Sequence, residues 1–162
     1  MQVRHAQTEH VKGICGVCTR GYWDTYTELY PSEYIQRIVD EFYNAERVSN
    51  EVRGGEWWVA VDGDTVVGAG SGGIISEAVG ELFVLYVEPS RKYQGIGTLL
   101  LNAITDELRR LGVREQWVSV AKGNLKGIPF YESRGFKFVE ERKAHASNKN
   151  EDFFSLRYRR AV

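Results

Sequence analysis

Hydrophobic and polar positions in the middle of the chain predict a strand, a glycine turn and a helix in direct succession. Residues 82–87 form an apolar run, rich in β-branched and aromatic residues, that is typical of a mostly buried strand. Pro89 and Ser90 end this run. A helix is expected to open at Thr98, because apolar residues then recur at helical spacing, at Leu99, Leu100, Ala103, Ile104, Leu108 and Leu111.

The N-terminal third is predicted to contain one strand and two helices. Residues 2–6 fit a strand, and a helix is expected to begin at Thr8 and to run toward Tyr22. Residues 50–55 are expected to form a polar loop. A second, amphipathic helix begins at residues 31–32 and carries on one face Ile35, Ile38, Val39 and Phe42.

The other segments predict five more strands and one short helix. Asp62-Gly63-Asp64 is a hairpin signal between two of these strands, and Gly112 is expected to cap the central helix. The short helix is opened by Asn124 and ends near Gly135, and residues 144–151 form a polar loop. The predicted strands are residues 56–61, 65–76, 116–121, 136–143 and 152–158.

The resulting order of elements is β-α-α-β-β-β-α-β-α-β-β, and this order determines the expected fold class. Strands and helices that alternate in this way predict an α/β (or α+β) fold, in which a mixed sheet carries helices on both faces. The length of 162 residues suits one compact domain, residues 1–162. No repeat and no domain linker is found in the sequence.

Composition and charge narrow the classes of partner. The formal net charge is −1, so no strong positive field is available to attract nucleic acid. No window approaches the 18 apolar residues of a membrane span, and the first ten residues lack the apolar region of a signal peptide. We therefore expect a cytoplasmic protein that binds neither nucleic acid nor a membrane.

Cys15 and Cys18 form the one C-x-x-C motif of the chain. This motif suits a redox pair or half of a zinc site, but the sequence has no second C-x-x-C and no pair of histidines at ligand spacing. The segment also fits a helix. We therefore favour plain packing of the two thiols in that helix, and we expect no bound metal.

A strand followed by a glycine loop and a helix is an arrangement that binds phosphate. Glycines allow backbone N–H groups to approach an anion, and the N-terminus of a helix adds unpaired donors and a positive dipole end. Arg91 and Lys92 add charge beside Gly95 and Gly97. The P-loop spacing is absent, and the dinucleotide fingerprint fails at its third glycine, where Leu100 stands.

Residues 92–97, K-Y-Q-G-I-G, resemble the acyl-CoA loop of the GNAT superfamily of acetyl-CoA-dependent N-acetyltransferases. The loop pattern of that family is [QR]-x-x-G-x-[GA], followed directly by a helix. Gly95 and Gly97 fit the pattern, whereas Lys92 replaces the usual Gln or Arg and Tyr93 replaces a frequent Gly. The resemblance covers residues 56–138, and the N-terminal third fits only in general organisation.

Residues 124–136 resemble the second signature of the same family, N-x-x-[AG]-x-x-[FL]-Y-x-x-x-G-F. The segment lies at the expected distance behind the glycine loop, after one helix and one strand. Pro129 departs from the pattern, because it removes a backbone donor inside the short helix. The positions that match are Asn124, Gly127, Phe130, Tyr131, Gly135 and Phe136.

The resemblance implies a GNAT-like, mostly antiparallel central sheet flanked by helices, with acetyl-CoA as co-substrate. The loop amides would hold the pyrophosphate, the strand before the loop would pair with the pantetheine arm, and Asn124 would either bind the arm or cap a helix. The residues implied in CoA binding are Leu85, Tyr86, Val87, Lys92, Tyr93, Gln94, Gly95, Ile96, Gly97, Thr98 and Asn124.

The implied reaction is the direct attack of a primary amine on the thioester. Tyr131 matches the family tyrosine that protonates the departing thiolate, and a core role is the alternative. Glu81 is the candidate general base, since it has the same spacing to the loop as the base of the histone-modifying members. A solvated strand-end carboxylate is equally open for Glu81, and many relatives use bound water instead. His145, in a polar loop, is a weaker candidate.

The acceptor is the least defined part of the prediction. Tyr22, Trp23 and Tyr26 could enclose a cation, with Asp24 or Glu28 as counter-charge, although aromatic residues more often fill a helix–sheet interface. We expect a small-molecule amine. A protein N-terminus or a lysine is the alternative acceptor, and a non-catalytic CoA-binding regulatory module is the alternative of another class. A homodimer is compatible with the sequence.

Overall fold

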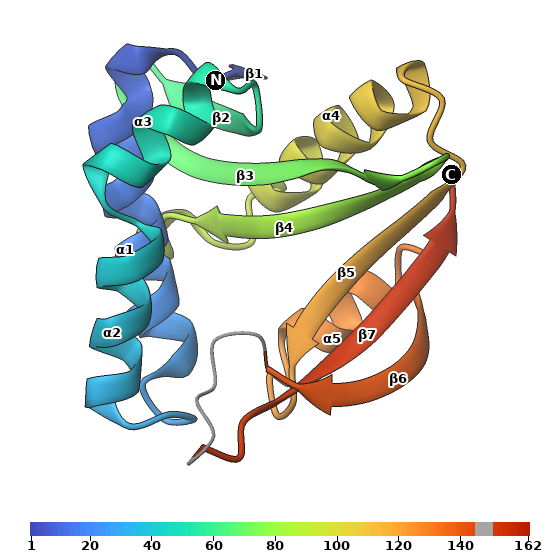
Figure 1. The fold of residues 1–162 in the computed structure, drawn as a ribbon. Helices are drawn as coiled ribbons and strands as arrows, with labels where there is room; N and C mark the ends of the chain where they lie inside the picture. Colours follow the sequence, from blue (N-terminus) through green and yellow to red (C-terminus); the bar gives the residue numbers. More distant parts are fainter. Residues whose placement is uncertain (145–150) are drawn as a thin grey trace.

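The computed structural model describes residues 1–144 and 151–162 of the chain. His145 and the middle of the predicted 144–151 loop therefore lie outside the described residues. Within the described residues, one mixed sheet organises the molecule (Figure 1). Its seven strands run in the order β1 (Gln2–His5), β2 (Trp57–Asp62), β3 (Thr65–Ser76), β4 (Val79–Val87), β5 (Glu115–Ala121), β7 (Phe154–Ala161) and β6 (Lys137–Lys143).

Only the central pair of strands is parallel. β4 and β5 run in the same direction, and every other neighbouring pair is antiparallel. The parallel pair is joined by a crossover through α4 (Ile96–Arg110), as a parallel connection requires. The fold class is thus the predicted one, an α/β architecture with a mostly antiparallel sheet.

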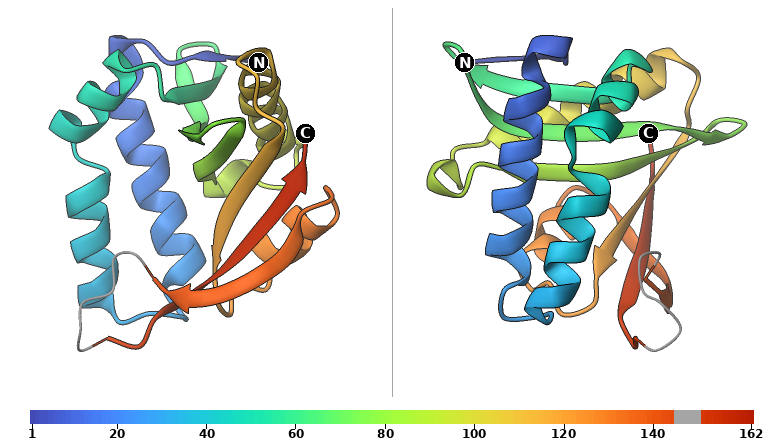
Figure 2. Two further views of the ribbon diagram at one scale, coloured as in Figure 1. Left: turned by 45° about the vertical axis from the view of Figure 1, so that its right-hand side comes forward. Right: turned by 60° about the vertical axis from the view of Figure 1, so that its left-hand side comes forward.

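Helices cover both faces of the sheet. α1 (Val11–Tyr26), α2 (Ser32–Phe42) and α3 (Ala45–Arg53) lie on one face, and both views of Figure 2 show α1 and α2 side by side. α4 and the short α5 (Gly127–Glu132) pack on the opposite face. The single-turn 3₁₀ helices η1 (Thr8–His10) and η2 (Pro89–Arg91) precede α1 and follow β4.

Small residues let the helices approach the sheet closely. A Cβ atom added at Gly13 of α1 would lie 2.5 Å from Val66 of β3, and one added at Gly68 of β3 would lie 2.8 Å from Ile96 of α4. Both distances are shorter than van der Waals contact, so these two glycines set the thickness of the helix–sheet layers. The glycine-rich composition of β3 therefore reflects helix packing on it.

One helix was missed by the sequence analysis. The predicted polar loop at residues 50–55 is wrong for its first part, because α3 runs through Arg53. Asn44 caps this helix by accepting a hydrogen bond from the backbone N–H of Arg47 at 2.9 Å. The buried face of this helix consists of Val48 and Val52, and two apolar positions are too few to reveal a helical period.

The other differences are local. α1 extends beyond the expected end to Tyr26, and α4 begins two residues before Thr98. Leu99 and Leu111 of the predicted apolar face are about half exposed, at 46% and 50%. The run 82–87 is less buried than predicted, since Leu82 is buried but Phe83 is 48% exposed. The reason is a break in the sheet beside β4.

Candidate active site

The sheet splits in its centre. β4 and β5 pair only from Val79 opposite Glu115 to Leu82 opposite Val118. Among the described residues, none pairs with β4 on that side beyond these pairs up to Val87, and Figure 1 shows the two strands diverging. Unpaired backbone N–H and C=O groups along a strand edge can accept an extended ligand as if it were a further strand.

A cleft of about 1210 Å³ occupies the split. Its walls come from β4, β5, the loop before α4, the end of α1 and the segment around α5. The cleft-lining residues include Asp24, Tyr26, Glu28, Leu85, Tyr86, Val87, Arg91, Lys92, Tyr93, Gly95, Ile96, Gly97, Thr98, Asn124, Lys126, Phe130, Tyr131 and Arg134. Most of the residues predicted to bind CoA are therefore gathered around one cavity.

A β-bulge in β4 changes which side chains face the helices. Ser71 of β3 pairs with Val84 and Gly72 pairs with Leu82, so Phe83 has no partner residue in β3. Past the bulge, Tyr86 packs with the aromatic cluster under α1, whereas Leu85 packs on the α4 side. Bulges of this kind are common beside active sites, where they redirect a side chain.

The glycine loop presents free backbone donors to the cleft. Gly95 has a φ of 83°, in the left-handed region, and α4 begins directly after it. The first helical hydrogen bond in this turn is donated by the N–H of Leu99 to the carbonyl of Gly95 at 3.1 Å. The N–H groups of residues 96–98 consequently have no helical acceptor, and they form a positive anion site.

Ion pairs fasten the loop to the rest of the fold. Glu88 accepts three hydrogen bonds from Arg20 of α1, at 2.9, 3.0 and 2.8 Å, and Arg91 pairs with Asp62 of the β2–β3 hairpin at 3.0 Å. Lys92 pairs with Asp24 near the end of α1. The side chain of Asp24, a candidate counter-charge for the acceptor, is thus bound to the glycine loop.

Tyr131 lies in α5 on the wall of the cleft. Its ring packs edge-on against Phe130 and Phe136, with centroids 5.0 and 5.5 Å apart. Burial raises the pKa of its hydroxyl, the nearby Tyr26 raises it further, and Arg134 partly opposes the shift. The hydroxyl therefore keeps its proton at neutral pH, and its role as proton donor stays a prediction.

Asn124 precedes α5 and faces the same cleft. Its side-chain oxygen accepts a hydrogen bond from the backbone N–H of Gly127 at 3.0 Å. The prediction that Asn124 opens and caps this helix is nevertheless wrong, because α5 begins at Gly127 and its N-cap residue is Lys126. The bond to the pantetheine arm stays a prediction.

Glu81 has a structural partner. Both of its carboxylate oxygens accept hydrogen bonds from Arg157 of β7, at 2.8 and 2.9 Å, and Arg157 also donates to Ser119 at 2.7 Å. The Glu81 side chain is only 16% exposed, and it is not among the residues that line the cleft. The general-base role of Glu81 stays a prediction, and this geometry favours an alternative in which the pair fastens β4 to β7.

The predicted acceptor aromatics are mostly buried. Tyr22 and Tyr26 are each 9% exposed and pack at a centroid distance of 4.4 Å, and burial raises the pKa of both hydroxyls. Trp23 packs partly buried against the same cluster. Of these three residues only Tyr26 lines the cleft. Glu28 is exposed, and its carboxylate lines the cleft as that of Asp24 does.

The two cysteines pack as favoured from the sequence. Cys18 is fully buried in the core beneath α1, Cys15 packs against the same cluster, and neither forms a disulfide. Burial raises the pKa of both thiols. Among the residues that the structure describes, no cluster of three or more His, Cys, Asp or Glu side chains could hold a metal ion.

Two charged cleft residues, Lys126 and Arg134, were not predicted from the sequence. Phe130, Lys126 and Arg134 line the cleft beside Tyr131, yet only Phe130 was noted, as part of a motif. Lys126 and Arg134 stand at positions where the second signature accepts any residue. The only available signal was their charge in a segment expected to face a phosphate-bearing ligand.

Comparison with known proteins identifies the class. The family model described as Acetyltransferase (GNAT) family matches residues 18–136, which is more than half of the chain. The chain belongs to this family, and it is an acyl-CoA-dependent N-acetyltransferase. In the described part of the chain, no helix has the length and apolar character needed to cross a membrane.

Individual relatives differ in acceptor. The spermidine N(1)-acetyltransferase of Thermoplasma acidophilum is 27% identical over 143 residues, which are 85% of this chain and 88% of that protein. The ribosomal protein bS18-alanine N-acetyltransferase of Escherichia coli K12 is 40% identical over 63 residues, which are 39% of this chain and 41% of that protein. The PaiA N-acetyltransferase of Thermoplasma acidophilum, solved in complex with coenzyme A, shares the fold, with a TM-score of 0.84, 23% identity and coverage of 99% and 98%.

The cleft fits coenzyme A on its own geometry. The unpaired edge of β4 offers partners for the amides of a pantetheine arm, and the N-terminus of α4 offers donors for phosphate. A Cβ atom added at Gly97 would lie 3.7 Å from both Val87 and Phe130, which line the cleft. A glycine at this position therefore keeps the cleft wide beside the anion site.

Proposed function

We propose that this chain transfers the acetyl group of acetyl-CoA to a primary amine of a small molecule, by direct attack in a ternary complex. The observation that carries the proposal is the split between β4 and β5, which opens beside the N-terminus of α4 and has Tyr131 on its wall. Acetyl-CoA supplies the activated thioester, and the residues of the chain hold and orient it.

Each part of the cleft has one task in this proposal. The N–H groups of residues 93–98 bind the pyrophosphate, and the free edge of residues 85–87 pairs with the amides of the arm. Asn124 binds the pantetheine arm where the arm enters the cleft. Gln94 and Lys92 shape the loop, and Lys92 does so through its ion pair with Asp24.

Tyr131 gives its proton to the sulfur as the bond between the sulfur and the acetyl carbon breaks, and the tyrosinate then regains a proton from water. The Tyr131 hydroxyl is protonated at neutral pH, it lies on the cleft wall, and a simple thiolate with a pKa of about 8.5 gains from a nearby donor. The amine loses its proton to water in the open cleft, because Glu81 is held by Arg157. Glu81 is the alternative base.

The acceptor enters from the side walled by the end of α1 and the turn that follows it. Tyr26 offers an aromatic wall, and Glu28 offers a carboxylate for an ammonium group. The spermidine acetyltransferase matches 85% of this chain, which supports a small amine as acceptor. The bS18-alanine acetyltransferase supports the second candidate, a protein N-terminus, over 39% of the chain.

The test is release of CoA from acetyl-CoA with a panel of acceptors. The panel contains polyamines, amino sugars, amino acids and short peptides with N-terminal alanine. Turnover with a polyamine or amino sugar is expected. Turnover with peptides alone would replace the small amine by a protein acceptor, and tight CoA binding without any turnover would favour the non-catalytic module.

A further inference from the structure

The positively charged side chains that line the cleft differ in whether a carboxylate of the protein pairs with them. Within the described residues they are Arg91, Lys92, Lys126 and Arg134. Arg91 is paired with a carboxylate of the hairpin and Lys92 with one of α1, so both charges are compensated by the protein. Arg134 instead donates its hydrogen bonds to neutral oxygens, namely Thr98 Oγ1 at 2.5 Å, the Phe130 carbonyl at 2.8 Å and Ser133 Oγ at 3.0 Å.

The location of Arg134 makes this uncompensated charge informative. Thr98 is the third residue of α4, so the guanidinium group lies at the helix end whose N–H groups are unpaired. The Phe130 ring supports it, with the guanidinium carbon 3.7 Å from the ring centroid. A fixed positive charge next to a positive helix end raises the electrostatic energy of the ligand-free fold, and an anion in the cleft would lower it.

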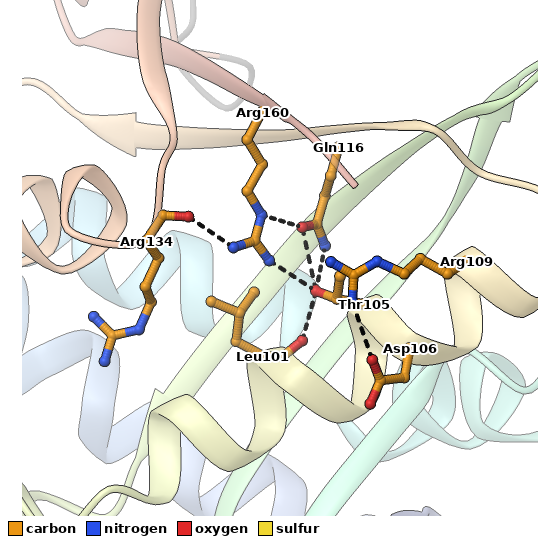
Figure 3. A network of polar contacts seen from close by, with 7 residues as sticks. All are labelled: Leu101, Thr105, Asp106, Arg109, Gln116, Arg134 and Arg160. Atoms are coloured by element: carbon orange, nitrogen blue, oxygen red, sulfur yellow. Dashed lines mark hydrogen bonds and ion pairs between the residues drawn. The ribbon is translucent and has the colours of Figure 1, made fainter.

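Arg160 holds the backbone of Arg134 from behind. Its guanidinium donates to the carbonyl of Arg134 at 2.8 Å, to Gln116 Oε1 at 3.0 Å and to Thr105 Oγ1 at 3.0 Å (Figure 3). Gln116 and Thr105 are buried, at 0% and 2% exposed, and the Thr105 hydroxyl donates onward to the carbonyl of Leu101 at 2.7 Å. One side chain thus ties β7 to β5, to α4 and to the turn after α5.

The choice of arginine at residue 160 follows from this geometry. A planar fork with five donors can reach three acceptors in different elements, whereas the ammonium group of lysine cannot span them. The site carries a cost, because burial lowers the pKa of Arg160, and the nearby Arg109 and Arg134 lower it further. The guanidinium of Arg160 thus lies close to Arg134, and its hydrogen-bond acceptors are a backbone carbonyl and neutral side-chain oxygens.

We propose that Arg134 binds a phosphate of coenzyme A and that Arg160 is the positioning residue that fixes Arg134 at the N-terminus of α4. This inference rests on the proposed use of acetyl-CoA. The pyrophosphate and the 3′-phosphate share the chemistry that Arg134 recognises. Comparison of CoA with 3′-dephospho-CoA distinguishes them.

Calorimetric titration of ligand into the purified protein tests the role of Arg134. Arg134→Gln should weaken CoA binding roughly tenfold, the loss expected when one charge-assisted hydrogen bond is replaced by a neutral one. Binding of pantetheine, which has no phosphate, should not change. Arg110→Gln is the matched control, because it removes an exposed arginine of α4 that pairs with Glu107 outside the cleft, and it should bind CoA as the wild type does.

The ligand series then assigns the phosphate. If Arg134→Gln weakens CoA but not 3′-dephospho-CoA, the contact is with the 3′-phosphate; equal loss for both assigns it to the pyrophosphate. Unchanged CoA affinity, or an equal loss with pantetheine, would overturn the proposal. A wild-type protein that binds no CoA would instead overturn the proposed function itself, so the two failures are distinguishable.

Arg160→Lys tests the positioning role. It keeps the charge but loses the fork, so CoA affinity should fall several-fold while pantetheine binding is retained. The double variant with Arg134→Gln should bind CoA no more weakly than Arg134→Gln alone. Additive losses would show that Arg160 acts independently and would overturn its role. If Arg160→Lys does not fold, Thr105→Val removes one acceptor of the same guanidinium and is expected to give the same non-additive result.

Discussion

At the scale of single residues, Tyr131 carries the chemical prediction. Tyr131→Phe should lower kcat by about 10²–10⁴-fold, the usual contribution of a positioned proton donor, and should leave the Kd for CoA unchanged. Because burial raises the pKa of the hydroxyl above its usual value, the donor should stay protonated at every pH below the usual tyrosine pKa of about 10. Stopped assays of CoA release, with calorimetry of CoA binding, give both quantities. An unchanged kcat would remove Tyr131 from the mechanism.

Glu81 leads to a prediction about stability. Glu81→Gln leaves Arg157, only 7% exposed, without its carboxylate, so the free energy of unfolding should fall by about 3 kcal/mol. The midpoint of thermal unfolding should fall by about 6–12 °C in a chain of this size. Glu115→Gln is the control, because its pair with Arg159 is exposed and a surface pair contributes at most about 1 kcal/mol. A large loss of kcat with an altered pH–rate profile and normal stability would instead identify Glu81 as the base.

At the scale of elements, a substitution at the start of α4 should affect the stability of the fold and the binding of CoA in opposite directions. Gly97 has a helical conformation and open space for a methyl group, since the nearest atoms are 3.7 Å from a built Cβ. Gly97→Ala should therefore raise the free energy of unfolding by about 0.5–1 kcal/mol, while the methyl group on the cleft wall weakens CoA binding. Chemical denaturation and calorimetry measure the two effects.

Gly95 gives the matched comparison in the same turn. No atom lies within 4 Å of a built Cβ, but the φ of 83° is unfavourable for any residue with a side chain. Gly95→Ala should therefore destabilise the fold by about 1–2 kcal/mol. If Gly97→Ala bound CoA as tightly as the wild type does, the anion site would lie elsewhere.

The order of elements apart from α3, and the glycine loop before α4, could be predicted from local patterns. The strand, glycine loop and helix are contiguous in sequence. The loop pattern specifies Gly95 and Gly97 directly, and the second signature specifies Tyr131. α3 could not be predicted, because its buried face consists of Val48 and Val52 alone. The extent of β4–β5 pairing and the bulge at Phe83 could not be predicted either, since both depend on tertiary contacts with other strands.

The roles of individual side chains were harder to predict than the elements that carry them, because these roles also depend on tertiary contacts. The spacing of Glu81 to the loop suggested a base, but its partner Arg157 lies 76 residues away in β7. Arg134 meets Thr98 only because α5 folds back against α4. In both cases the decisive contact joins elements that no sequence pattern places side by side.

At the scale of the whole molecule, the cleft separates two parts that are joined by little pairing. One part contains β1 to β4 with α1, α3 and α4, and the other contains β5, β6, β7 and α5. Between them the sheet is continuous only where Val79–Leu82 pair with Glu115–Val118, together with the apolar cluster that α4 shares with β5. A ligand in the cleft contacts both parts at once.

This arrangement predicts that CoA binding stabilises the protein as a whole. At a free CoA concentration of one hundred times Kd, the free energy of unfolding should rise by about 2.7 kcal/mol, so the unfolding midpoint should rise by about 5–11 °C. Hydrogen exchange should slow in β5 and α5 as well as in β4, because the ligand closes the gap that leaves these edges open. Protection confined to β4 and the glycine loop would show that the ligand binds one wall only, and the split would then not be the CoA site.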